Sequence, residues 1–148
     1  MKSLISFVLI SLICLKAQPL LAGESDVDNA VVRISTFHEL ESDLENLKDE
    51  REKMNGALKN NTGLQVRYAI RIANILGRIE SRLKTMEYLL DKNAPLGKKI
   101  GDLRFSSRDA SSELSYSIDT KILQKIEVVE TDLSKVLTNL REEGKDKP

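Results

Sequence analysis

Apolar residues recur along the chain at alternating steps of three and four residues, which is the spacing of one face of an α-helix. Three stretches have this pattern, and none of the chain shows the sustained two-residue alternation that is typical of β-strands. The pattern predicts an all-α fold with helices at about residues 37–58, 64–91 and 112–141. The three stripes are Phe37, Leu40, Leu44, Leu47, Met54 and Leu58, then Ala69, Ile72, Leu76, Ile79, Leu83, Met86 and Leu90, then Ile122, Ile126, Val129, Leu133, Val136 and Leu140.

The stripes are wider than the strict seam of a two-stranded coiled coil. Ile75 and Leu89 flank the second stripe, and Leu123 and Leu137 flank the third. A wide apolar face favours a helix with two packing neighbours. We therefore expect an antiparallel three-helix bundle with coiled-coil-like seams.

The start of the first helix has two interpretations. Thr36 followed by Glu39 matches a capping box, which would leave residues 26–35 as a separate turn or short helix. Val31 and Ile34 equally allow the helix to extend backwards. Both interpretations stay open at the level of sequence.

Residues 92–112 form the irregular stretch of the chain, with Pro95, Gly97, Gly101 and a serine-rich end. We expect a long connection, and connections of this length are often functional or disordered. The alternative is that part of it packs as a short helix through its apolar residues, which are Leu96, Ile100, Leu103 and Phe105.

The N-terminus has the features of a secretory signal peptide, at residues 1–22. Lys2 supplies the positive end, and residues 4–15 are mainly apolar. This run is too short for a membrane span, which needs about 20 residues. We expect cleavage after Ala22, with an uncleaved membrane anchor as the alternative. The secreted chain would then have a helical bundle at residues 23–141 and a charged tail at residues 142–148.

The cysteine content and the net charge indicate where the protein acts and which partners bulk charge does not recruit. The single cysteine, Cys14, lies within the predicted signal peptide, so the secreted chain would contain no disulfide. The 23 basic and 23 acidic residues balance, so bulk charge does not attract nucleic acid. We expect an extracellular protein that is held together by side-chain packing alone.

Catalytic and metal-binding patterns are missing from the sequence. His38 is the only histidine, and no second metal ligand follows one helical turn later. The serines have no second histidine or Gly-x-Ser-x-Gly turn to activate them, and there is no glycine-rich phosphate loop. We predict a protein without enzymatic activity, cofactor or metal.

Charge is unevenly distributed between the first two helices. Residues 26–60 carry nine acids against five bases, whereas residues 62–92 carry six bases against three acids. One interpretation is an acidic helix lying beside a basic helix, which would help to select antiparallel register. The other is an exposed cationic surface for a protein partner, an anionic lipid or a glycan, formed by Arg67, Arg71, Arg78 and Arg82.

Three further positions have paired interpretations. Arg51 occupies a seam position, where it either sets helix register or marks an outward rotation of the helix. Gly77 lies inside the second helix, which indicates either close helix approach or simple tolerance. Asn60 begins the glycosylation sequon that ends at Thr62, so we expect a glycoprotein, although Thr62 also fits a helix cap.

In size, leader and helix content the chain resembles the small secreted helical proteins of animal glandular fluids, such as seminal, salivary or venom secretions. From its residues we expect a non-enzymatic protein that acts by binding a protein partner, with self-association into a homo-oligomer as one form of that binding. The first alternative is an amphipathic lipid-binding bundle, similar to the exchangeable apolipoproteins. The second is a bacterial periplasmic chaperone or secretion-system component.

Overall fold

The computed structural model describes the backbone of residues 2–58, 62–91 and 93–143. It describes side chains at 26–58, 63–91 and 93–142. These residues contain helices and no strand, so the predicted all-α class is confirmed. The helices are α1 (Lys2–Ala57), α2 (Thr62–Leu89), α3 (Pro95–Glu113) and α4 (Thr120–Glu143).

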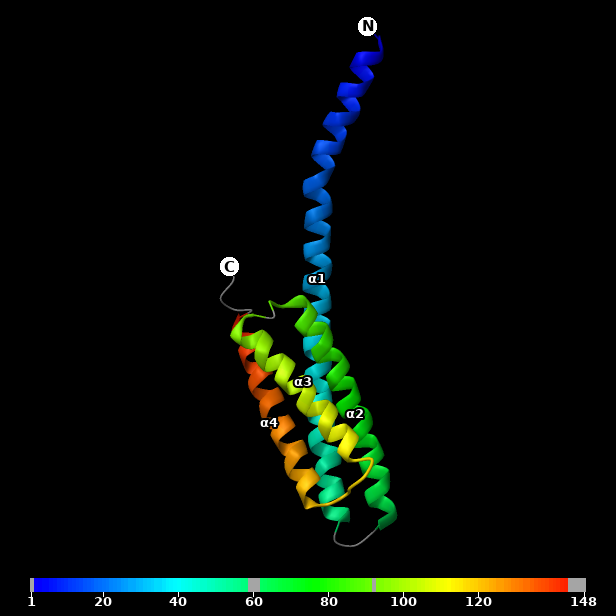
Figure 1. Ribbon diagram of the computed structural model, residues 1–148, viewed down its shortest axis with the longest axis vertical. Coiled ribbons are helices and arrows are strands. Elements are labelled where there is room, and N and C mark those ends of the chain that lie inside the picture. The colour runs from blue at the N-terminus through cyan, green and yellow to red at the C-terminus, as the bar shows by residue number, and fades with distance from the viewer. Residues whose placement is uncertain (1, 59–61, 92, 144–148) are drawn as a thin grey trace. The chain divides into compact units, whose positions relative to one another are not determined.

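The chain divides into two compact units, residues 1–35 and residues 36–148. In the second unit, residues 36–57 of α1 pack with α2, α3 and α4, and successive helices run in opposite directions (Figure 1). All four segments contribute to one apolar core, because each presents a face of buried aliphatic side chains. Its fully buried members include Leu40, Leu47, Met54, Ile72, Leu76, Ile79, Leu83, Met86, Ile100, Ile122, Ile126 and Leu133.

The predicted count of three helices is wrong, because the stretch expected to be a long connection contains α3. Ala94 precedes this helix with an extended backbone, at φ −64° and ψ 148°, and Pro95 is its first residue. Proline fits the first helical position, because its fixed φ is already helical and its missing N–H would have no partner there. Pro95 therefore starts a helix in the stretch that was expected to be irregular.

The buried face of α3 follows the same spacing as the other three helices, but with small and polar members. Ser107 is fully buried in this face, and its hydroxyl donates a hydrogen bond of 2.9 Å to the Leu103 carbonyl oxygen. This bond satisfies the hydroxyl inside an apolar core. The buried residues of α3 are Leu96, Gly97, Ile100, Leu103, Ser107 and Ala110, and Leu114, just after the helix, is buried as well.

The last helix starts at Thr120, whereas the sequence pattern predicted a start at about residue 112. Asp119 caps it: its Oδ1 atom accepts hydrogen bonds from the backbone N–H groups of Lys121, at 2.8 Å, and Ile122, at 3.0 Å. The bond from Ile122, together with a hydrogen bond from the Ser117 hydroxyl, lowers the pKa of the Asp119 carboxyl. A cap and a turn therefore separate α3 from α4.

Helix α1 continues through Thr36, so the alternative in which the helix extends backwards is the one that the structure shows. Thr36 is buried and lies in the interior of α1, with helical residues on both sides, so the helix does not start there. Ala22 and Asn60 lie outside the residues whose side chains are described, so the predicted cleavage and glycosylation sites stay predictions. Within the described part of the chain, no helix has the length and apolar character needed to span a membrane.

Candidate functional site

The arginines of α2 face the acids of α1, and one buried carboxylate is shared by two of them. The Asp43 side chain is only 3% exposed. Arg78 donates from Nε to Asp43 Oδ1 at 3.0 Å, and Arg82 donates to Asp43 Oδ2. Arg82 also bonds Glu39, with 3.0 Å between Nε and Oε2. Charge-assisted bonds of this kind tie the acidic helix to the basic one.

Arg71 contacts α1 more loosely. Its Nη1 atom lies 3.4 Å from both carboxylate oxygens of Glu50. Beside this pair the surface has a shallow polar groove of about 350 Å³, lined by Asn46, Glu50, Arg71, Asn74, Ile75 and Arg78. Three of the four arginines proposed as a partner surface therefore already pair with α1 carboxylates.

Arg67 differs from the other three arginines of α2. It is exposed, and it has no ion-pair partner among the residues that the structure describes. Val66 and Ile70 lie beside it on the first turns of α2, with exposed fractions of 48% and 58%. We call these three residues, Val66, Arg67 and Ile70, the α2 patch. Sequence reasoning found its cation but missed its apolar members, because both belong to an apolar-rich helix whose other side chains fill the core.

Arg51 forms a second interhelical ion pair, between α1 and α4. Its Nε donates to Glu130 Oε1 at 2.7 Å, and the two side chains are 19% and 5% exposed. The hydrogen bond from Arg51 to Glu130 raises the pKa of the guanidinium above its ordinary value, so Arg51 stays charged. Arg51 thus points towards α4, which supports the interpretation that it sets helix register.

Gly77 marks no close helix approach. A Cβ atom built on this residue would have nothing within 4 Å, apart from its own helix and chain neighbours. Of the two interpretations of Gly77, the structure supports simple tolerance.

His38 lies on the exposed face of α1. Its Nδ1 atom is 3.2 Å from Glu41 Oε2, one helical turn away, and its ring contacts the edge of Phe37. Among the described residues, no three His, Cys, Asp or Glu side chains gather closely enough to hold a metal ion.

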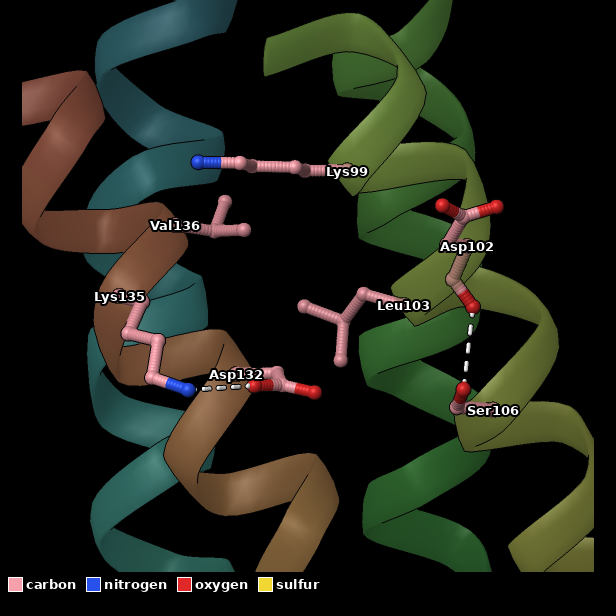
Figure 2. A pocket seen from close by; sticks show the side chains of 7 residues that line it. All are labelled: Lys99, Asp102, Leu103, Ser106, Asp132, Lys135 and Val136. Carbon is pink, nitrogen blue, oxygen red and sulfur yellow. Dashed lines mark hydrogen bonds and ion pairs between the residues drawn. The ribbon is translucent and has the colours of Figure 1, made fainter. Parts of the chain in front are cut away.

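A groove of about 290 Å³ lies between α3 and α4, and Figure 2 shows its residues. Leu103 and Val136 are its buried apolar members, and charged side chains of both signs stand around them. Lys135 Nζ pairs with Asp132 Oδ1 at 3.0 Å. The Ser106 hydroxyl donates to the Asp102 carbonyl oxygen at 3.1 Å. With both signs of charge present, the groove favours no particular class of ligand.

Comparison of the chain with known protein families, with curated proteins and with solved structures found no match. The argument for function therefore depends on the surface features of this chain itself.

Proposed function

We propose that this chain is a secreted, non-enzymatic helical protein that acts by binding a protein partner through the α2 patch. The observation that carries the proposal is the pairing of exposed aliphatic side chains, Val66 and Ile70, with an arginine that has no partner in the described part of the chain. Neighbouring apolar side chains exposed on one helix face indicate an interaction site. Arginine is among the residues enriched at protein interfaces.

The rest of the arginine surface plays a different part in this proposal. Arg78 and Arg82 neutralise Asp43, whose carboxylate is almost fully buried, so removing them would disturb the bundle itself. Arg67 can be changed without breaking an ion pair within the described residues. The partner would therefore contact Arg67 near the N-terminal end of α2, whereas Arg78 and Arg82, further along α2, would hold α1 in place.

Secretion in this proposal depends on the leader at residues 1–22, with cleavage at Ala22, and a glandular fluid is the setting that we propose. Glycosylation at Asn60 would place a glycan six residues before Val66 in the chain. The contact itself is small, so we expect a weak and transient complex.

The experiment is capture of partners from the secreted fluid by the purified chain, with molar mass measured by light scattering. The double variant V66S/I70S and the single variant R67E should each lose the partner. V128S is the matched control, because Val128 is an exposed aliphatic residue of α4, at 57%. Equal capture by the wild type and by both patch variants would contradict the proposal.

Liposome flotation separates protein binding from lipid binding. The wide apolar stripes that favoured a lipid-binding bundle are buried in the four-helix core, so they would reach lipid only if the bundle opened. We expect the chain to stay at the bottom of the gradient with vesicles of phosphatidylcholine and phosphatidylserine. Flotation that V66S/I70S abolishes would assign the patch to lipid instead.

A further inference from the structure

A second exposed apolar face lies on α1, before the four-helix unit. Val27, Val31 and Ile34 are 63%, 60% and 59% exposed, and their spacing of four and three residues places them on one face of the helix. We call these three residues the α1 stripe. They follow the predicted cleavage site at Ala22, so they belong to the secreted chain.

Charge distinguishes the α1 stripe from the α2 patch. Asp26 and Asp28 flank the stripe, and Arg33, the one base within residues 26–35, already has an interaction within the chain. The α2 patch carries Arg67 instead. Pairing two α1 stripes would bring aspartates together, and pairing two α2 patches would bring arginines together. Only the pairing of a stripe with a patch combines apolar contact with charge attraction.

We propose that the α1 stripe of one copy docks on the α2 patch of a second copy of this chain. The inference rests on the proposed function, because it names a second copy as the occupant of the same patch. Each copy offers one stripe and one patch, and we include in this proposal the reciprocal exchange of the two stripes between the copies of a dimer. A single stripe–patch contact is small, so the dimer forms at high concentration and dissociates on dilution.

The first test is sedimentation velocity of the full chain over a range of concentrations. The wild type should shift from monomer towards dimer as concentration rises, and added salt should weaken the dimer. Two charge variants, R67E and D26K/D28K, should each weaken association by about threefold to tenfold, because each turns an attraction into a repulsion. R108E is the matched control, because Arg108 is an exposed arginine of α3 with no ion-pair partner among the described residues.

Mixing the two charge variants gives the decisive result. The D26K/D28K chain has a basic stripe and a basic patch, whereas the R67E chain has an acidic stripe and an acidic patch. Neither should dimerise well alone, but in the mixed dimer both contacts are complementary, so mixing should restore association. Mixing R108E with D26K/D28K leaves one of the two contacts repulsive, so it should restore clearly less association than mixing R67E with D26K/D28K.

Three results would overturn the inference. They are a wild type that stays monomeric at all concentrations, an R67E chain that associates as well as the wild type, and a mixture that behaves like its separate components. Capture of a different protein by the α2 patch, from a chain that stays monomeric, would reject the second copy as occupant and leave the proposed function standing. Loss of both capture and self-association would reject the two together.

Discussion

Arg51 and Glu130 join α1 to α4 across 79 positions of sequence, with 2.7 Å between Arg51 Nε and Glu130 Oε1. Both lie at positions whose neighbours along the helix are core residues, and the Glu130 side chain is 5% exposed. A buried carboxylate is stable here because the guanidinium supplies its counter-charge. The pair also favours one alignment of α1 against α4, because a shift by one helical turn would leave both charges unpaired.

Removing one partner of this ion pair should lower the free energy of unfolding more than replacing both partners by apolar residues. We expect R51A to lower the free energy of unfolding by about 3 kcal/mol, because Glu130 is left buried without a partner. The double variant R51M/E130L should be close to the wild type or more stable, since it removes both charges and keeps side-chain volume. Urea denaturation followed by circular dichroism measures both. An R51A chain as stable as the double variant would show that the pair does not act as a unit.

Asp43 should be the most sensitive charged residue on the α1–α2 face. We expect D43A to lower the free energy of unfolding by about 1.5–3 kcal/mol, because two charge-assisted hydrogen bonds are lost and Arg82, whose side chain is 24% exposed, keeps only Glu39 as a partner. E50A removes the partner of Arg71, whose side chain is 47% exposed, and should cost about 0.5 kcal/mol or less. Thermal denaturation of the two variants compares them directly. Similar losses for both would mean that the shared carboxylate has no special role.

Asp119 should give α4 a dependence on pH. Its pKa is lowered in the folded chain, so its stabilising effect is complete above the unfolded value of about 3.9 and is lost as pH falls through the folded value. We expect D119A to lower the melting temperature at neutral pH, and to lower it by less at a pH below the folded pKa, where the carboxyl is protonated in both states. D119N should keep most of the cap. An equal loss for D119A at both values of pH would contradict a charged cap.

Gly77 is a position where stability can be gained. Since a Cβ atom there meets nothing within 4 Å, G77A should raise the free energy of unfolding by about 0.5–1 kcal/mol through better helix propensity alone. G56A, in the last turn of α1 with equally open surroundings, should gain less because helix ends fray. Guanidinium denaturation measures both changes. A loss of stability in G77A would indicate that a second chain packs against this face of α2.

The expectations that came true in the structure are those that depend on local spacing. Leu40, Leu47, Ile72, Leu83 and Ile126 were placed on apolar stripes and are fully buried. The spacing of apolar residues along the chain was enough to predict their burial, because a helix with one apolar face has to bury that face. Helix α3, which the sequence offered only as the alternative to a long connection, has the same period, but Ser107 and Ala110 weakened the signal and Pro95 with two glycines suggested a loop.

The candidate site could be anticipated only in part, because ion pairs depend on which helices become neighbours. The sequence showed an acidic helix, a basic helix and four aligned arginines. It could not show that Arg78 pairs with a carboxylate whereas Arg67 has no ion-pair partner among the described residues. That difference follows from Asp43 on a neighbouring helix, 35 positions away from Arg78. Likewise, the sequence could not show that Val66 is left exposed, because this depends on which side of α2 the other helices cover.

The sequence by itself determined that the chain is helical and which face of most helices is apolar, because both follow from contacts within a few residues. The tertiary structure decided the number of helices in the bundle, the partners of Arg51 and Asp43, and the side chains left outside the core. These depend on residues that are distant in the chain and meet only when the helices pack. In the sequence, Arg51 is only a charged residue at a position where an apolar one is expected. Its role becomes clear from its ion pair with Glu130 on another helix.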